Sequence, residues 1–303
     1  MLKVDEILKF LDAENIVYSF VGDKELQING FSSLNQYKEG TFTWAKKQEN
    51  IPDNFDLSKI ALLFTNETVV GEFNNVIRTA ESKRAFFSTI EHFYTGDEDR
   101  PAVGFGTYIS PKVKLGKNVR IGHNCTLDGD ITIGDDTIIE NNVSIINYCT
   151  IGKNCLLHSG VVIGTDGFGY STDEDGVPIK VKHFGGTVIG HNTEIGANTC
   201  IDRGTIDNTT IGCNVKIDNL VHIAHNCEIE DDCMVITQSA ICGSAKLRKK
   251  SYIAPGSIIK NQIEIGENAF VGLGAVVLQN VSKDSVVIGV PAKELRKVSE
   301  KDK

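Results

Sequence analysis

An aliphatic residue returns at every sixth position through most of this sequence. The series starts at residue 109, is interrupted after residue 163, and after one slip of four residues runs on to residue 277. Its members are Ile109, Leu115, Ile121, Leu127, Ile133, Ile139, Ile145, Ile151, Leu157 and Ile163, then Ile189, Ile195 and Ile201, then Ile211, Ile217, Ile223, Ile229, Val235, Ile241, Leu247, Ile253, Ile259, Ile265, Val271 and Val277. Helical periodicity would need spacings of three and four, and strand alternation alone would not demand one residue type at every sixth place. The pattern therefore predicts a parallel β-helix assembled from hexapeptides.

The residues between the aliphatic positions fit a left-handed parallel β-helix, in which three hexads complete one triangular coil. Segments such as "IGHN", "IGDD", "IGKN" and "IGEN" place glycine and asparagine or aspartate where the chain turns, because these residues tolerate left-handed backbone conformations. Five cysteines stand four residues after a repeat aliphatic, and we expect them to point inward as small packing residues. They are Cys125, Cys149, Cys155, Cys227 and Cys233.

The repeat divides a mainly β chain into three regions. Residues 101–290 are expected to form the β-helix. Residues 1–100 combine an apolar helix face, the β-like runs "IVYSFVG" and "ALLFTN", and a second helical stretch, "SKRAFFSTIEHFY". These features predict a small α/β domain that ends near Arg100 and Pro101. Residues 291–303 are rich in charge and are expected to form a short C-terminal helix. The first helix face consists of Val4, Ile7, Leu8 and Leu11.

A long insertion over residues 165–186, "TDGFGYSTDEDGVPIKVKHFGG", interrupts the repeat. A glycine-rich loop that leaves a regular solenoid is either a tolerated insertion or a functional arm. Phe168 and Tyr170 lie near its start, and aromatic side chains in such a loop favour the functional arm. We expect both residues to contact a substrate.

The composition limits the partners and the compartment. The formal net charge is -9, and an acidic chain is not expected to bind nucleic acid, because phosphate binding needs a positive surface. The first segment, "MLKVDEILKF", carries acidic residues where a signal peptide would need an apolar core, and no apolar run reaches membrane-spanning length. We therefore expect a cytoplasmic protein without a membrane span, whose eight cysteines, with no CxxC pair among them, stay as thiols.

Three histidines occupy the same corner position of their hexads, and asparagine follows each of them. They are His123, His191 and His225, so position alone selects none as a catalytic residue. His225 differs in its surroundings, because one coil takes about eighteen residues and Gly243 falls one coil further along at the same corner. A histidine can take a proton from a nucleophile while a neighbouring N–H stabilises the oxyanion of a thioester carbonyl, which is what acyl transfer needs. A solvated corner histidine remains the alternative interpretation.

Further residues stand near His225 in this arrangement. Asp218 and Asn219 lie one hexad earlier and are candidates for orienting a substrate, and Gln262 falls near the His225 corner after one more coil. His222 is at an outward-facing position of its hexad, where a solvated side chain is expected.

Several segments carry a family resemblance. "IDRGTIDNTTIGCNVKIDNLVHIAHN" and the later "ICGS", the loop segment "GTDGFGY", and "VGDKELQINGFSSLNQYKEGTFTWA" near the N-terminus resemble the LpxD family, the UDP-3-O-(3-hydroxyacyl)glucosamine N-acyltransferases of lipid A biosynthesis. The resemblance spans nearly the whole chain. It implies a nucleotide-binding domain ahead of the β-helix, a homotrimer with active sites between adjacent β-helices, and direct transfer of a 3-hydroxyacyl group from a thioester to a sugar amine. No metal or bound cofactor is implied, since the acyl thioester is a co-substrate.

The resemblance also implies roles at matching positions. His225 would be the general base, and the N–H of Gly243 would form the oxyanion hole. Trp44 would stack on the nucleobase, while Asp218 and Asn219 would line the sugar end of the cleft.

Other positions depart from the family pattern. Gln262 stands where the family commonly has a second histidine near the substrate, and Lys47 and Asn50 replace residues common at the nucleobase site. The ending "VIGVPAKELRKVSEKDK" resembles that of coenzyme A-dependent hexapeptide acetyltransferases, so the donor is either an acyl carrier protein or coenzyme A. An acidic carrier protein would need a local positive patch, for which residues 248–250, "RKK", are the candidates.

Three other functions compete with this one. A coenzyme A-dependent N-acyltransferase could act on another nucleotide-linked amino sugar, such as a dTDP-amino sugar for surface polysaccharide. A metal-dependent hydratase resembling γ-class carbonic anhydrase would hold zinc through three histidines and expects a pair five residues apart, whereas His222 and His225 are three apart. A solenoid that only binds partners would make the pairing of His225 with Gly243 accidental.

Overall fold

The computed structural model describes residues 1–52, 55–95, 101–291 and 293–299, and the chain divides into two compact units, 1–99 and 100–303. The predicted domain boundary at Arg100 lies outside the described residues. Among the described residues, no helix has the length and apolar character that crossing a membrane requires.

The first unit is the predicted small α/β domain. Helix α1 (Val4–Ala13) buries all four residues of the expected apolar face, and α2 (Ser82–Tyr94) coincides with the second helical stretch. The two β-like runs contain β2 (Ser19–Val21) and β5 (Leu62–Thr65), which belong to a sheet in the order β2-β6-β5-β4. The other elements are β1 (Leu2–Lys3), β3 (Gln27–Ile28), β4 (Phe42–Ala45), β6 (Val76–Arg78), η1 (Leu34–Gln36), η2 (Gln48–Asn50) and η3 (Leu57–Lys59).

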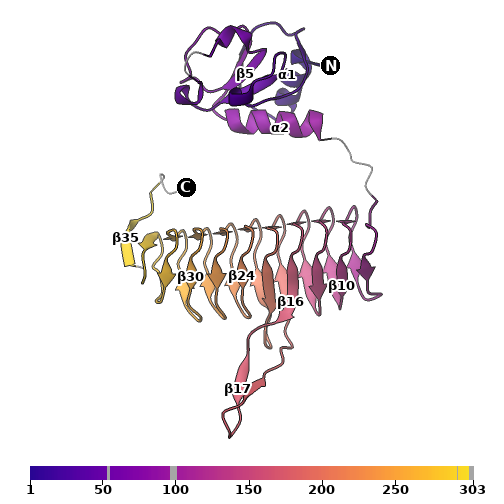
Figure 1. Ribbon diagram of the computed structural model, residues 1–303, viewed down its shortest axis with the longest axis vertical. Helices are drawn as coiled ribbons and strands as arrows, with labels where there is room; N and C mark the ends of the chain where they lie inside the picture. The colour runs from indigo at the N-terminus through magenta and orange to yellow at the C-terminus, as the bar shows by residue number, and fades with distance from the viewer. Residues whose placement is uncertain (53–54, 96–100, 292, 300–303) are drawn as a thin grey trace. The chain divides into compact units, whose positions relative to one another are not determined.

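The second unit is the predicted left-handed parallel β-helix, whose short strands stack coil upon coil (Figure 1). Its described strands form three long sheets, here named I, II and III. Sheet I contains β7 (Tyr108–Ile109), β10 (Thr126–Asp128), β13 (Ser144–Ile146), β16 (Val162–Asp166), β21 (Cys200–Arg203), β24 (His222–Ile223), β27 (Ala240–Ile241), β30 (Ile258–Ile259) and β33 (Val276–Val277). Sheet II contains β8 (Lys114–Leu115), β11 (Ile131–Ile133), β14 (Cys149–Ile151), β19 (Thr187–Ile189), β22 (Thr209–Ile211), β25 (Glu228–Ile229), β28 (Lys246–Leu247) and β31 (Glu264–Ile265). Sheet III contains β9 (Arg120–Ile121), β12 (Ile138–Ile139), β15 (Leu156–Leu157), β20 (Glu194–Ile195), β23 (Lys216–Ile217), β26 (Met234–Val235), β29 (Tyr252–Ile253), β32 (Phe270–Val271), β34 (Ser285–Ile288) and β35 (Lys293–Lys297).

The hexad residues build one continuous core. Leu127, for example, pairs with Ile145 on the following coil and with Ile109 on the preceding one, so aliphatic residues stack along the axis. The five predicted inward cysteines are buried in the same core, and burial raises the pKa of Cys149 and of Cys227 to about 12. Their packing role is confirmed. Leu115 is an exception, 41% exposed, because it lies in the first coil, where no earlier coil covers it.

The predicted C-terminal helix is wrong. Residues Lys293–Lys297 form strand β35, which pairs antiparallel with β34 through Val286 and Arg296. Strand β34 would otherwise leave its backbone N–H and C=O groups unpaired at the edge of sheet III, and pairing these groups outweighs helix propensity. The exposed charges of β35 then leave an edge that resists further strand addition.

The chain turns at three kinds of corner, named here by the sheets they join. His123 lies at a III–I corner between β9 and β10, His191 at a II–III corner between β19 and β20, and His225 at a I–II corner between β24 and β25. The three histidines therefore share a hexad position but face three different edges of the β-helix.

Both irregularities of the repeat fall at the I–II corner. The insertion over residues 165–186 leaves after β16 and carries the hairpin β17 (Tyr170–Thr172) and β18 (Pro178–Lys180), which projects from the coils in Figure 1. The four-residue slip lies between β21 and β22, at residues 204–208. The corner that carries His225 is thus the one where the solenoid departs from regularity.

Candidate active site

Nδ1 of His225 donates a hydrogen bond to a side chain of the same corner. This atom lies 3.0 Å from Oδ1 of Asn226, and the same oxygen accepts from the N–H of Thr205 at 3.1 Å and from its hydroxyl at 3.0 Å. Because the amide oxygen is an acceptor, Nδ1 of His225 must carry the hydrogen. In the neutral ring Nε2 is then bare, as a general base requires.

The two other corner histidines have the opposite arrangement. Nδ1 of His123 accepts from the backbone N–H of Phe105 at 2.8 Å, and Nδ1 of His191 accepts from that of Lys153 at 2.9 Å. In their neutral forms the hydrogen therefore lies on Nε2, and neither ring has a free base there. This hydrogen bonding separates His225 from the other two, which the hexad position could not do.

Gly243 lies against the imidazole of His225, as the coil spacing predicts. A Cβ atom on Gly243 would stand 2.9 Å from both Cε1 and Nε2 of His225, so a side chain there would displace the ring. At some corners the N–H of this hexad position donates to a side chain on the next coil, for example from His123 to Oδ1 of Asn141 at 2.7 Å. The Gly243 N–H has no such partner among the described residues. It is therefore available to an oxyanion beside Nε2 of His225.

The insertion also contributes to this corner. A Cβ on Gly167 would lie 2.7 Å from Cδ2 of His225, so glycine is required on both sides of the imidazole. His183, near the end of the insertion, has its ring centroid 5.2 Å from that of His225. Sequence reasoning missed Gly167 and His183, because no periodicity relates an insertion to the coil that it contacts.

Gln262, Phe168 and Tyr170 are exposed residues of the I–II corner and of the insertion. Gln262 is exposed at the I–II corner, and its N–H donates to the Gly243 carbonyl at 3.0 Å. Phe168 and Tyr170 belong to the projecting insertion, with ring centroids 4.8 Å apart and with Phe168 87% exposed. Their roles in substrate binding stay predictions.

Asp218 and Asn219 lie at a III–I corner, one hexad away from His225. Six residues of extended chain span on the order of 20 Å, so one chain alone does not bring this pair to the base. Both side chains are fixed: Asp218 accepts from the N–H groups of Asn219 at 2.7 Å and Thr237 at 3.2 Å, and Asn219 accepts from Ala197 N–H at 2.6 Å. They line a cavity of about 540 Å³ that also contains His158.

His158 sits between two glutamates in this cavity. Its Nδ1 lies 3.2 Å from Glu140 Oε1, and its Nε2 lies 3.0 Å from Glu194 Oε1. Burial alone would lower the pKa of His158, but hydrogen bonds and charges from Glu194 and Glu140 outweigh it and raise that pKa above its ordinary value of 6.5. Burial alone would likewise raise the pKa of Glu140, but hydrogen bonds from Ser159 and the charge of His158 outweigh it and lower that pKa.

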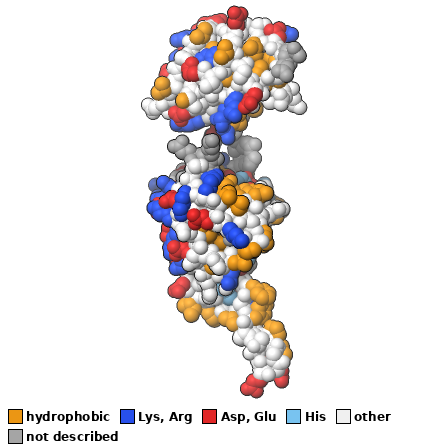
Figure 2. Space-filling view, turned by 90° about the vertical axis from the view of Figure 1, so that its left-hand side faces the viewer, with side chains coloured by type: hydrophobic (Ala, Val, Ile, Leu, Met, Phe, Trp, Pro, Cys, Tyr) orange, Lys and Arg blue, Asp and Glu red, His pale blue; other side chains and the backbone are white. Residues whose placement is uncertain are grey.

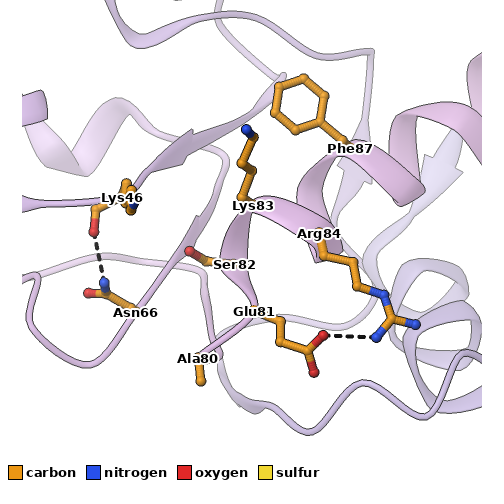
Figure 3. A pocket seen from close by; sticks show the side chains of 8 residues that line it. All are labelled: Lys46, Asn66, Ala80, Glu81, Ser82, Lys83, Arg84 and Phe87. Atoms are coloured by element: carbon orange, nitrogen blue, oxygen red, sulfur yellow. Dashed lines mark hydrogen bonds and ion pairs between the residues drawn. The ribbon is translucent and has the colours of Figure 1, made fainter. Parts of the chain in front are cut away.

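Trp44 is partly buried in the first unit. Its ring stacks on Phe86 of α2 at a centroid distance of 6.2 Å, and its Nε1–H donates to the Ser82 hydroxyl at 3.2 Å. Ser82 lines a cavity of about 520 Å³ next to it, shown in Figure 3, whose cations include Lys46, Lys83 and Arg84. Lys47 directly precedes η2 and Asn50 is its last residue, and the Lys47 N–H donates to Asn50 Oδ1 at 2.9 Å.

Much of the expected positive patch at residues 248–250 is neutralised. Arg248 pairs with Glu230 at 2.9 Å and with Glu264 at 2.5 Å, and Lys249 pairs with Asp232 at 3.5 Å. Figure 2 shows charges of both signs mixed along one edge of the β-helix and hydrophobic side chains gathered toward the base of the hairpin. In the described part of the chain, no group of three or more His, Cys, Asp or Glu side chains could hold a metal ion.

Family models match the repeat. The model described as "Bacterial transferase hexapeptide (six repeats)" matches residues 130–165 and 208–235, and "Hexapeptide repeat of succinyl-transferase" matches residues 112–146. The chain is 31% identical to the UDP-3-O-acylglucosamine N-acyltransferase of Desulfotalea psychrophila over 94% of its own length and 88% of that protein. It is 34% identical to UDP-3-O-acylglucosamine N-acyltransferase 1 of Francisella tularensis subsp. holarctica, covering 72% and 69% of the two chains.

Two solved acyltransferase structures resemble about two thirds of this chain, and at their low sequence identity they support the fold alone. The UDP-N-acetylglucosamine acyltransferase LpxA of Bacteroides fragilis has a TM-score of 0.56 at 24% identity, covering 62% of this chain and 71% of that one. The UDP-N-acetylglucosamine acyltransferase of Campylobacter jejuni has a TM-score of 0.57 at 22% identity, covering 64% and 73%.

Replacing Gly243 tests the contact between its backbone and the imidazole. In Gly243→Ala the new methyl group would displace the His225 ring while the fold is kept, because a side chain can move where a coil cannot. Since a displacement of about 1 Å can cost roughly 100-fold in rate, we expect turnover to fall by about that factor. Steady-state kinetics with circular dichroism as the folding control measure this, and turnover within about threefold of wild type would contradict the arrangement.

The cluster around His158 predicts a pH-dependent contribution to stability. A histidine with a raised pKa stabilises the fold fully below its unfolded value of about 6.5 and loses this contribution as pH rises through the folded value. The melting temperature of wild type should therefore exceed that of His158→Gln most near about pH 6, and the difference should shrink by about pH 9. Thermal denaturation across this range measures it. Glu140→Gln, which removes one charged partner of His158, should weaken this pH dependence. A difference in melting temperature that stays constant with pH would refute a charged His158.

Proposed function

This chain belongs to the family of UDP-3-O-acylglucosamine N-acyltransferases, and we propose that it transfers a 3-hydroxyacyl group from an acyl thioester to the amine of UDP-3-O-acylglucosamine in lipid A biosynthesis. One observation carries the catalytic part of the proposal: a bare Nε2 on His225 lies beside the unpartnered N–H of Gly243 among the described residues. Aminolysis of a thioester needs a base close to an N–H that can donate a hydrogen bond to the oxyanion.

The proposed reaction proceeds by direct attack. The sugar amine attacks the thioester carbonyl, and Nε2 of His225 takes the proton that the nitrogen loses. The carbonyl electrons move to oxygen, and the Gly243 N–H stabilises the resulting oxyanion. Collapse of the tetrahedral intermediate forms the amide and breaks the carbon–sulfur bond, and the leaving thiolate takes the proton from His225.

An acyl-cysteine intermediate finds no support at this corner. Cys242 directly precedes Gly243, but it is half-buried, and burial raises the pKa of its thiol. A thiol whose pKa is raised is a poor nucleophile at neutral pH, because the thiolate is the reactive form. In the proposed reaction the thioester therefore passes its acyl group directly to the sugar amine.

We infer a homotrimer, the assembly that the family resemblance implies, and the distance between the two groups of site residues supports an oligomer. His225 is at a I–II corner and the fixed pair Asp218 and Asn219 is at a III–I corner, so a corner of one subunit can meet the other corner of a neighbour only in an oligomer. A closed cyclic assembly would repeat this pairing at each interface. The pair would then hold the acceptor sugar against the neighbour's base.

The nucleotide end of the substrate is assigned to the first unit. Trp44 is partly buried and offers an aromatic ring for stacking. The neighbouring cavity carries Lys46 and Lys83, whose charges suit a diphosphate, whereas Arg84 is already paired with Glu81 at 2.8 Å.

The donor is open between an acyl carrier protein and coenzyme A. Arg248 and Lys249, at the expected carrier-protein patch, are already paired. Lys250 is exposed, and it has no ion pair among the described residues, so it is the cation of the patch that a carrier protein could contact. A cytoplasmic location stays a prediction.

His225→Ala should remove the base and lower turnover by about 100-fold or more, since positioned general bases contribute about 100- to 10,000-fold. The assay is mass-spectrometric detection of acyl transfer, and His191→Ala is the matched control, because His191 has the same hexad position at a different corner. Control activity should stay within about twofold of wild type. Near-normal turnover by His225→Ala would refute the base assignment.

The same assay separates the candidate substrates. 3-Hydroxyacyl carrier protein and short acyl-coenzyme A are offered in parallel with UDP-3-O-acylglucosamine and a dTDP-amino sugar. Transfer to the UDP sugar supports the proposal. Transfer only from coenzyme A to the dTDP sugar would overturn the proposed substrate while keeping the reaction class, and no transfer to either acceptor would contradict an N-acyltransferase.

Trp44→Ala should mainly raise the Michaelis constant for the nucleotide sugar, by about 5- to 100-fold for the loss of one aromatic ring stacked on a base, with a smaller change in kcat. Trp44→Phe, which keeps an aromatic face, is the matched control and should retain most of the affinity. An unchanged Michaelis constant in a folded Trp44→Ala protein would mean that Trp44 serves only the packing around α2.

A further inference from the structure

His183 is a buried histidine in contact with the base assigned above. It is 3% exposed, and its ring centroid lies 5.2 Å from that of His225 with the two planes at 77°. This edge-to-face geometry is a favoured packing of two aromatic rings. The contact joins the end of the insertion to the I–II corner, two segments that lie far apart in the sequence.

The two nitrogens of His183 have very different surroundings. Nδ1 lies 3.0 Å from the carbonyl oxygen of Val181 and must donate to it, because a carbonyl only accepts. Nε2 is buried and has no hydrogen-bond partner in the part of the chain that the structure describes. An unpaired buried polar atom costs stability, so an apolar ring would serve packing alone better.

The backbone around His183 is held in place from two sides. Its N–H points to Oδ2 of Asp166 at 3.4 Å, and Nε of Arg203 lies 4.0 Å from Oδ1 of the same carboxylate. Arg203 also donates from Nε to the carbonyl of Gly185 at 2.7 Å. The arginine of the "IDRG" segment therefore fixes the returning end of the insertion, and with it the position of the His183 ring.

The glycines of "DGFGY" make room for the two imidazoles. A Cβ on Gly169 would lie 2.8 Å from Cε1 of His183, and one on Gly167 would lie 2.7 Å from Cδ2 of His225. Each ring therefore occupies space that a side chain on the insertion would otherwise fill. The insertion is shaped around the pair of rings.

We propose that His183 is a positioning residue for acyl transfer, which holds the imidazole of His225 in its orientation at Gly243. This inference rests on the proposed function, because it takes His225 as the base. His183 is fixed through Val181 and the Arg203–Asp166 pair, and its ring restricts the rotation of the His225 ring. The unpaired Nε2 of His183 lowers stability, and a destabilising feature that is kept beside a reactive group is typical of functional sites.

His183→Phe provides the first test, since it keeps a ring but removes the unpaired nitrogen and the hydrogen bond to Val181. We expect kcat to fall about 10- to 100-fold, because a ring that is no longer anchored to the Val181 carbonyl no longer holds the base in place, with Michaelis constants for donor and acceptor within about twofold. The melting temperature should be unchanged or higher. A kcat within about twofold of wild type would overturn the proposal, and so would a rise in a Michaelis constant that accounts for the whole loss.

Gly169→Ala provides a second test that leaves both histidines in place. The new methyl group would displace the His183 ring, so kcat should fall as it does in His183→Phe. In a His183→Ala background, where the ring is absent, Gly169→Ala should have little further effect. Equal losses of kcat in both backgrounds would contradict an action through His183.

The variants distinguish the role of His183 from that of His225. If His225→Ala is inactive while His183→Phe and Gly169→Ala are normal, the base assignment stands and the positioning role is wrong. If His225→Ala itself keeps normal turnover, the proposed function has failed first.

Discussion

The hydrogen bond from Nδ1 of His225 to Oδ1 of Asn226 is the interaction on which the candidate active site depends. It fixes which nitrogen is bare, and that nitrogen, Nε2, lies on the side of the ring that is packed against Gly243. Asn226 can accept this bond because Thr205 also donates to its oxygen and so fixes the orientation of the amide. Thr205 belongs to the segment that breaks the hexad series, so the base is a product of that irregularity.

The regular coils and the irregular corner have separate tasks. Stacked aliphatic residues and buried thiols form a rigid core, which places the same corner of each coil at a repeating position. At several ordinary corners the N–H at the corner position of the hexad donates to a side chain on the next coil, as His123 does to Asn141 and Cys213 does to Asp231, and such an N–H is not available to a substrate. At the I–II corner, glycines and the two departures from the repeat release an N–H, a base and a space beside them.

The main elements of the architecture could be predicted from the sequence. Hexad spacing, inward cysteines and the apolar face of α1 are local patterns, and each is typical of one kind of structure. The sequence also paired His225 with Gly243, since coil length converts sequence separation into stacking. It could not reveal the role of each Nδ1 or the contact of His183, which depend on how an aperiodic insertion folds back. The tail was predicted wrongly as a helix because the free edge of β34 is a tertiary feature.

The most direct measurement of the central claim is the tautomer of each corner histidine, read from nitrogen–proton correlation spectra of protein labelled with nitrogen-15 histidine and assigned by single substitutions. The account predicts that neutral His225 carries its hydrogen on Nδ1, whereas His123 and His191 carry theirs on Nε2. The two latter rings serve as internal references within one sample. A neutral His225 with its hydrogen on Nε2 would contradict the account, because the nitrogen on the Gly243 side of the ring would then be a donor and not a base.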